Sequence, residues 1–133
     1  MPDRLIYLDS SIALRAILDA PDRRGIQAWL QDQDATIVSS RLLRTEIIRV
    51  LRREHWPLED ATPLLDRVGT LEITRETHTV AESIERHVKT LDALHLATAL
   101  LIGESVTVAT HDVGMATAAE HLGLAVTDPV TSR

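Results

Sequence analysis

The sequence predicts a three-layer α/β fold, in which helices cover both faces of a central parallel sheet of four to five strands. Two observations support this prediction. Short apolar runs, such as residues 5–8 and 105–109, alternate along the chain with longer helical segments, which is the pattern of parallel strands joined by helices. The predicted helices also outnumber the predicted strands, so pairs of helices must connect some strands.

The first half of the chain predicts two strands and three helices. Pro21 breaks the first helix, and Pro57 breaks the third, because proline cannot continue a helical hydrogen-bond ladder. Ser39 or Ser40 is a good N-cap for the third helix. The predicted order is strand 4–8, helix 11–19, helix 22–32, strand 35–39 and helix 41–55.

The second half predicts four further helices and three short strands. Thr90 is a good N-cap, and Gly123 is a plausible stop at the end of the last helix. The predicted order is helix 58–68, strand 71–75, helix 77–88, helix 91–103, strand 105–109, helix 113–122 and a strand near 124–127.

The composition predicts one domain over residues 1–133. A chain of 133 residues is long enough to bury a core, which aliphatic residues must fill because the sequence has no Phe, one Tyr and two Trp. The absence of Cys excludes disulfides and thiolate metal sites and fits a reducing cytoplasm. The start, MPDRLIYLDS, resembles neither a signal peptide nor a membrane span, so we expect no membrane association.

The charge is unevenly distributed. The net charge of −6 argues against a protein that coats nucleic acid non-specifically. However, the segment RLLRTEIIRVLRRE carries five arginines against two acids, whereas after Lys89 the only base is Arg133. The sequence therefore predicts one basic helix and an acidic C-terminal third.

Two acids follow predicted strands. Asp9 follows the first strand, and Asp112 follows the fourth, which ends in the run VTVATH. Ligands of open α/β sheets bind outside the carboxyl ends of the strands. We therefore expect Asp9 and Asp112 to lie at the same edge of the sheet.

Two further acids lie on helices that the apolar pattern predicts to be buried. Glu46 lies within helix 41–55, where Leu42 and Val50 flank it one turn before and one turn after. Asp92 is in the first turn of LDALHLATALLI, a helix that is apolar nearly all round. A buried carboxylate is unfavourable unless it is paired or bound to a metal.

Each acid also has a purely structural interpretation. The two acids at the strand ends could serve only as N-caps of the helices that follow. Asp92 could interact only with the dipole of its helix, and Glu46 could pair with Arg49 or Arg53.

Taken together, the four acids favour a metal site. Four converging carboxylates would repel one another and would not all ionise without a cation. All-oxygen sites suit Mg²⁺ or Mn²⁺, which activate water and stabilise phosphate oxygens. Ser11 and Thr110 lie beside two of the acids, where a hydroxyl can hydrogen-bond a carboxylate or a metal-bound water. The chemistry indicated is metal-dependent hydrolysis of phosphodiesters.

Four segments, in this order along the chain, match a known family. They are YLDSSIAL, VSSRLLRTEIIRVL, TLDALHLATAL and VTVATHDVGMATAAEHLGLAV. Their pattern resembles the PIN-domain ribonucleases, and among them the VapC-type toxins of toxin–antitoxin pairs. The resemblance covers essentially the whole chain and implies a PIN-like fold with Mg²⁺- or Mn²⁺-dependent endoribonuclease activity. By position it implies metal-site roles for four acids and supporting roles for two hydroxyls: Asp9, Glu46, Asp92, Asp112, Ser11 and Thr110.

The resemblance also implies partners. VapC-type toxins usually form homodimers and are inhibited by a small antitoxin, and the family suggests transfer RNA or a ribosomal RNA loop as substrate. We find no helix-turn-helix signature, so direct DNA binding would belong to the antitoxin. Arg49 and Arg53 are the best candidates for RNA contact, because they lie on Glu46's side of the helix.

Other interpretations remain open at this point. His95 and His111 lie beside two of the acids and could contact a phosphate, although a hydrogen-bonded structural histidine is the favoured interpretation. A catalytically inactive PIN-fold interaction module is the main alternative function. A receiver-like signalling domain would need a lysine after a late strand, whereas Lys89 precedes a helix.

Overall fold

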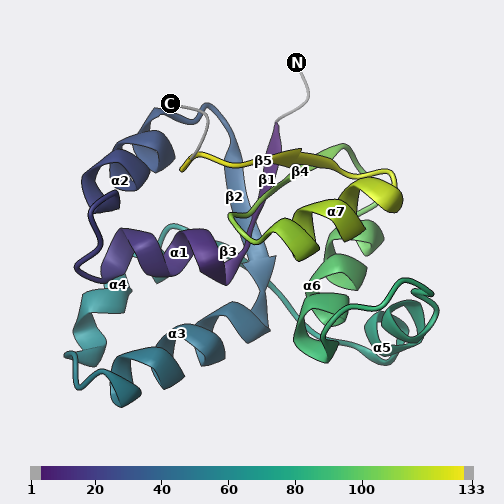
Figure 1. The fold of residues 1–133 in the computed structure, drawn as a ribbon, viewed down its shortest axis with the longest axis horizontal. Coiled ribbons are helices and arrows are strands. Elements are labelled where there is room, and N and C mark those ends of the chain that lie inside the picture. Colours follow the sequence, from purple (N-terminus) through teal and green to yellow (C-terminus); the bar gives the residue numbers. More distant parts are fainter. Residues whose placement is uncertain (1–3, 131–133) are drawn as a thin grey trace.

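The computed structural model describes residues 4–130 and contains a parallel sheet with helices on both faces (Figure 1). Its strands are β1 (Leu5–Leu8), β2 (Thr36–Ser40), β3 (Gly69–Leu71), β4 (Val106–Ala109) and β5 (Ala125–Thr127). The α-helices are α1 (Ser10–Ile17), α2 (Arg23–Asp32), α3 (Arg41–Arg53), α4 (Thr62–Leu65), α5 (Arg75–Glu82), α6 (Thr90–Leu101) and α7 (Val113–His121), and a 3₁₀ helix, η1, spans Leu58–Ala61.

The sheet has the strand order β3-β2-β1-β4-β5, and all its strand pairs are parallel. β1 is central, with Tyr7 opposite Val38 of β2 and Val108 of β4. Because the strands run in one direction, the residues that follow β1 and β4 emerge at the same edge, as the sequence predicted.

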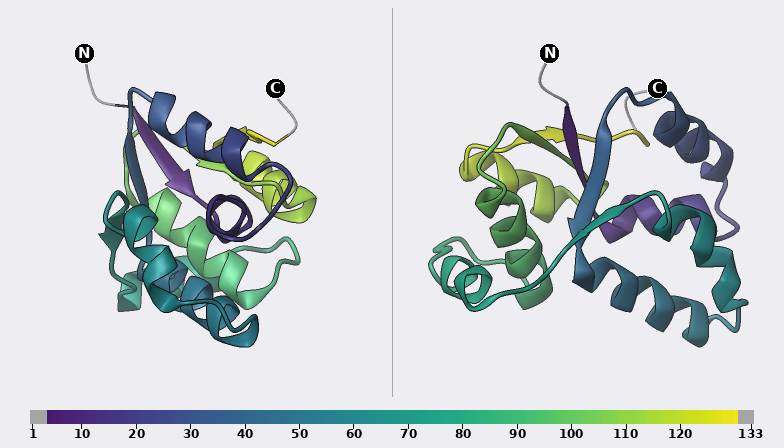
Figure 2. Two further views of the ribbon diagram at one scale, coloured as in Figure 1. Left: turned by 90° about the vertical axis from the view of Figure 1, so that its left-hand side faces the viewer. Right: turned by 180° about the vertical axis from the view of Figure 1, so that it is seen from behind.

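Alternating side chains of β1 divide the core into two halves. Ile6 and Leu8 belong to an apolar cluster with residues of α1, α2, α3 and α4, whereas Tyr7 belongs to a second cluster with residues of α6 and α7. Figures 1 and 2 show α1–α4 on one side of the sheet and α5–α7 on the other. The three-layer α/β fold with a five-stranded parallel sheet is therefore confirmed.

Local signals position several helices as predicted. The Ser40 hydroxyl caps α3 by accepting a hydrogen bond from the Leu42 N–H. Gly123 follows α7 with a φ of +84°, a left-handed conformation that glycine adopts without strain. The predicted cap at Thr90 is wrong, because Thr90 is the first residue of α6 and Lys89 occupies the cap position.

Three predicted elements differ from the structure. The strand expected at 71–75 is β3 at Gly69–Leu71, which pairs with the end of β2. The helix expected at 77–88 corresponds to α5, which begins two residues earlier, at Arg75. The earlier start is due to a reciprocal N-terminal cap between Thr74 and Thr77. Helix α5 ends at Glu82, and the apolar residues beyond it pack on the core from an irregular segment. The helix expected at 58–68 is divided into η1 and α4, where Pro63 cannot donate to the ladder.

No helix among residues 4–130 is both long enough and apolar enough to span a bilayer.

Candidate active site

The candidate site lies where β1 and β4 end. Asp9 follows β1, Thr110 follows β4, and the Asp9 N–H donates to the Ala109 carbonyl 3.0 Å away. The Asp9 side chain is only 4% exposed, so its carboxylate requires polar partners within the protein.

Two hydroxyls hold the Asp9 carboxylate. Ser11 Oγ donates to Asp9 Oδ2 at 2.7 Å, and Thr110 Oγ1 donates to the same oxygen at 2.8 Å. Both hydroxyls also accept backbone hydrogen bonds, Ser11 from the His111 N–H and Thr110 from the Asp112 N–H. The sequence prediction that Ser11 and Thr110 lie beside the acids therefore corresponds to direct bonds. Asp9 Oδ1 receives no hydrogen bond from the residues that the structure describes.

Asp9 and Asp112 occupy equivalent positions but differ in their roles. Both are N-cap residues, of α1 and α7. Asp112 Oδ1 accepts a hydrogen bond from the Met115 N–H, so the N-cap interpretation of Asp112 is confirmed. Asp9 makes no side-chain cap bond, and its carboxylate is directed to the two hydroxyls instead. A cap role therefore does not account for the Asp9 side chain.

Glu46 of α3 is held by residues on two other elements. Its Oε1 is 2.6 Å from His95 Nε2 of α6, and its Oε2 accepts a 3.4 Å hydrogen bond from Ser10 Oγ. The alternative pairing with Arg49 or Arg53 is wrong, because neither arginine forms an ion pair with Glu46.

A buried chain of hydrogen bonds connects the sheet to Glu46. The Ser40 N–H donates to Tyr7 Oη at 3.1 Å, and Tyr7 Oη is 2.6 Å from His95 Nδ1. Because Tyr7 accepts from Ser40, its proton can be donated to His95, whose Nε2–H then donates to Glu46. Tyr7 and His95 are both fully buried. Burial raises the pKa of the Tyr7 phenol far above its ordinary value, so Tyr7 stays protonated in this chain.

Sequence reasoning identified this chain only in part. It favoured hydrogen-bonded histidines, which is confirmed for His95 and for His111, whose Nδ1 is 2.9 Å from Asp128 Oδ2. It missed Tyr7 and Ser10. The available signal for Tyr7 was its place in a buried strand, since a buried phenol needs a hydrogen-bond partner.

The Asp92 carboxyl is affected electrostatically by the other three acids. Burial is the largest effect that raises the pKa of the Asp92 carboxyl, followed by repulsion from Asp9 and Asp112, with a further contribution from Glu46. Only His95 opposes this shift. The Asp92 side chain forms no hydrogen bond or ion pair with the residues described. Its carboxylate therefore lies in a partly buried environment with excess negative charge, which a cation would relieve.

The donor set fits a hard cation chemically. All four acids offer carboxylate oxygens, and the Asp9 Oδ1 and Asp92 oxygens are not used by hydrogen bonds within residues 4–130. In the same part of the chain, no group of three or more acids or histidines is arranged to hold a metal ion. Mg²⁺ is compatible with this arrangement, since it commonly uses one or two carboxylates and keeps several waters.

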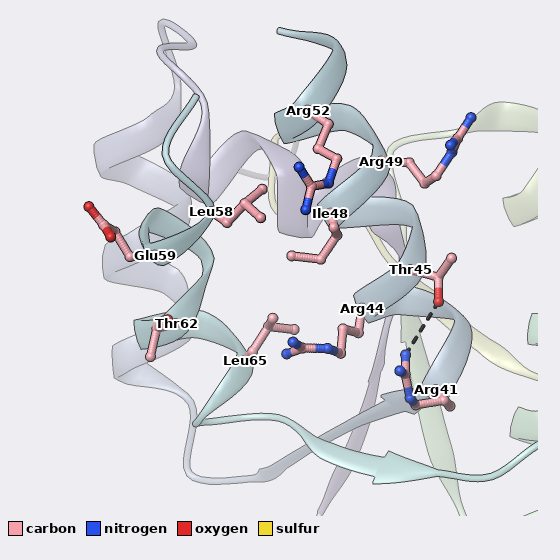
Figure 3. Close-up of a pocket in the computed structure, with 10 residues that line it drawn as sticks. All are labelled: Arg41, Arg44, Thr45, Ile48, Arg49, Arg52, Leu58, Glu59, Thr62 and Leu65. Atoms are coloured by element: carbon pink, nitrogen blue, oxygen red, sulfur yellow. Dashed lines mark hydrogen bonds between the residues drawn. The ribbon is translucent and has the colours of Figure 1, made fainter. Parts of the chain in front are cut away.

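The two predicted RNA-binding arginines, Arg49 and Arg53, form no ion pair with any of the four acids. Arg53 is paired with Glu54 at 3.1 Å on the exposed side of α3. Arg49 lines a pocket between α3 and α4 and points outward from it (Figure 3). No contact in the described residues brings either arginine to Asp9, Asp92 or Asp112.

Comparison with known proteins gives consistent matches. The profile of the PIN domain matches residues 6–121. Ribonuclease VapC46 of Mycobacterium tuberculosis is 32% identical over 127 residues, which cover 93% of this chain and 97% of that protein. A toxin-antitoxin complex from Klebsiella pneumoniae contains a similar structure, with a TM-score of 0.73, 18% identity, and coverage of 93% of this chain and 97% of that chain.

A second solved structure is also similar in fold. VapC20 of Mycobacterium tuberculosis, described as a Sarcin-Ricin loop cleaving toxin, matches with a TM-score of 0.70 and 15% identity. The match covers 85% of this chain and 94% of VapC20. At this level of identity, the two structures support a likeness of fold alone.

Proposed function

This chain belongs to the PIN domain family, and we propose that it is a metal-dependent endoribonuclease toxin that hydrolyses phosphodiester bonds of a structured RNA. The observation that carries the proposal is the partly buried cluster of acids at the ends of β1 and β4, where Ser11 and Thr110 hold one oxygen of Asp9. Burial, and then repulsion from Asp9, Asp112 and Glu46, raises the pKa of Asp92 in this cluster. The family match and the relative named as a ribonuclease support the same activity. A transfer RNA or a ribosomal RNA loop is the proposed substrate, and the loop-cleaving activity stated for VapC20 supports this class.

In the proposed site, Asp9, Glu46, Asp92 and Asp112 would together hold Mg²⁺ or Mn²⁺, with one or two of these carboxylates binding the ion directly and the others binding it through retained waters. When bound, such an ion supplies an activated water and neutralises charge on the phosphate. Ser11 and Thr110 orient Asp9 by donating to one of its oxygens, which leaves the other for a ligand. Tyr7 and His95 orient Glu46 through their two 2.6 Å contacts. Arg49 and Arg53 would contact the RNA backbone.

The proposed partners follow from the family and its neighbours. We expect an antitoxin to inhibit this chain, because a similar structure is part of a toxin-antitoxin complex. We also propose a homodimer, a cytoplasmic location, one functional domain over residues 1–133, and no direct contact with membrane or DNA.

The test is cleavage of a small-RNA pool by the purified, antitoxin-free chain. Reactions would contain Mg²⁺, Mn²⁺ or EDTA, beside the Asp92→Asn variant. A control variant, Asp60→Asn, removes an exposed carboxylate from η1, outside the proposed site. We expect discrete fragments that require metal, persist with Asp60→Asn and disappear with Asp92→Asn.

The result would also separate the enzyme from its main alternative, a PIN-fold interaction module without catalytic activity. Absence of metal-dependent cleavage by a folded wild-type sample would favour that module. Cleavage that Asp92→Asn leaves unchanged would show that a different site, or a contaminant, carries the activity.

A further inference from the structure

The outer side of α3 forms a pocket with η1 and α4 that is separate from the acids described above (Figure 3). Its volume is about 460 Å³. Arg44 and Arg52 extend into it, whereas Arg41 turns toward Thr45 and Arg49 points outward. Apolar side chains from both walls line the rest of the pocket: Ile48, Leu58 and Leu65.

The arginines of this pocket lack carboxylate partners. The side chains of Arg44, Arg49 and Arg52 form no hydrogen bond or ion pair with the other described residues, and the Arg41 guanidinium bonds only the Thr45 hydroxyl, at 3.3 Å. Four arginines and one acid, Glu59, line the pocket, and two of the guanidinium groups, those of Arg44 and Arg52, extend into it. The fold therefore places several arginines without a carboxylate partner around one pocket, which favours the binding of an anion there. Planar guanidinium groups match the oxygens of a phosphate particularly well.

The charge of the whole chain makes this pocket more informative. An RNA approaching a protein with a net charge of −6 is repelled on average, so a ribonuclease of this composition needs a local basic surface to hold its substrate. Of the 14 lysines and arginines in the chain, five lie on α3. Four of those five line this pocket.

We propose that the pocket binds backbone phosphates of the RNA substrate, away from the bond that is cleaved. This inference rests on the proposed ribonuclease function and adds a second contact surface to it. Arg49 connects the two surfaces, because it lies one turn from Glu46 on α3. Arg41 and Arg52 are separated by about 16 Å along the helix axis, at about 1.5 Å per residue. That length is sufficient to meet several successive phosphates.

RNA is favoured over an acidic protein segment by the position and exposure of these groups. All four arginines are solvent-exposed and follow one helix, as a continuous polyanion requires. Arg49, at the edge of this pocket, is also one helical turn from Glu46 of the candidate active site. The binding of an acidic peptide instead is an outcome that the experiment below distinguishes.

The test measures binding of a fluorescein-labelled single-stranded RNA to the full chain in EDTA, so that metal-dependent cleavage does not interfere. The variant is Arg44→Gln with Arg52→Gln, which removes the two guanidinium groups that extend into the pocket. The matched control is Arg75→Gln with Arg86→Gln, two exposed arginines outside α3. Each pair changes the net charge by two, from −6 to −8.

We expect the pocket variant to weaken RNA binding much more than the control. For single strands, each phosphate contact contributes a salt slope of about −0.7, equivalent to about fivefold in affinity at 0.1 M salt. Loss of two contacts should therefore raise the Kd about 25-fold and reduce the salt slope by about 1.4. Equal effects of the pocket and control variants would overturn the proposal. Competition by poly-glutamate as effective as that by unlabelled RNA of matched charge would also overturn it, in favour of an acidic protein segment.

Cleavage assays on the same proteins separate this inference from the proposed function. Wild-type protein that binds RNA through the pocket, yet cleaves none with Mg²⁺ or Mn²⁺, would contradict the ribonuclease proposal alone. Metal-dependent cleavage that is equally efficient, in kcat/KM, for the pocket variant and the wild type would contradict the pocket proposal alone.

Discussion

The Tyr7→Phe substitution tests the buried hydrogen-bond chain that leads to Glu46. The phenylalanine ring fits the same space and keeps the edge-to-face contact with His95, whose ring centroid is 5.7 Å from that of Tyr7. Only the hydroxyl is lost. Its removal leaves His95 Nδ1 without a donor and the Ser40 N–H without an acceptor, in a region where Tyr7 and His95 are fully buried.

The expected magnitude follows from these two unsatisfied groups. Each buried polar group left without a partner costs about 1–3 kcal/mol, so the two together give about 2–6 kcal/mol. Phenylalanine also removes the unfavourable burial of the phenol itself, which lowers the total. We therefore expect the free energy of unfolding to decrease by about 2–3 kcal/mol, a large fraction of the 5–15 kcal/mol typical of a domain.

The assay is urea denaturation of metal-free protein, followed by circular dichroism. The control is Thr79→Val, which removes an exposed hydroxyl that donates to the Arg75 carbonyl on α5. Its effect should stay within about 0.5 kcal/mol. A Tyr7→Phe variant that is no less stable than Thr79→Val would refute the hydrogen-bond chain as a stabilising feature.

Three further predictions concern the acids. Asp92→Asn should abolish metal-dependent cleavage. It should also stabilise the metal-free fold, because folding raises the pKa of the Asp92 carboxyl and so disfavours its charged form. A variant that is less stable than wild type in a urea titration would contradict this. Since the folded protein holds that proton more tightly than the unfolded chain, the stability difference between wild type and Asp92→Asn should be largest above the folded-state pKa. It should shrink as the pH falls through the folded-state pKa and disappear below the ordinary aspartate pKa of 3.8, whereas a difference independent of pH would exclude this origin. Thr110→Val leaves the Asp112 N–H without its acceptor and leaves Asp9 with one hydroxyl donor. It should therefore lower the free energy of unfolding by about 1–3 kcal/mol and weaken Mn²⁺ binding. Unchanged Mn²⁺ affinity would show that Thr110 does not orient Asp9.

The sequence correctly predicted which acids lie at the carboxyl edge of the sheet, because the direction of the strands alone determines it. Asp9 and Asp112 follow strands that belong to one parallel sheet, so their placement required only the order of strands and helices. Ser11 and Thr110 could be predicted for the same reason, since each lies within two residues of an acid.

The contacts of Glu46 could not be predicted in this way. Its partner His95 is 49 residues away, and Tyr7 is 88 residues from His95. Helical periodicity indicates which face of α3 or α6 is apolar, but it does not indicate which helices contact each other in the fold. The early start of α5 was missed for a different reason, because the Thr74–Thr77 cap competes locally with an apolar pattern that extends further along the chain.

The most direct test of the proposed metal site is Mn²⁺ binding in the absence of RNA, measured by electron paramagnetic resonance of the free ion. Wild-type protein, Asp92→Asn and the exposed-site control Asp60→Asn would be titrated side by side. We predict saturable binding that Asp60→Asn retains and Asp92→Asn loses or weakens at least tenfold, about 1.4 kcal/mol. Equal Mn²⁺ affinity in wild type and Asp92→Asn would contradict a metal site built on these four acids.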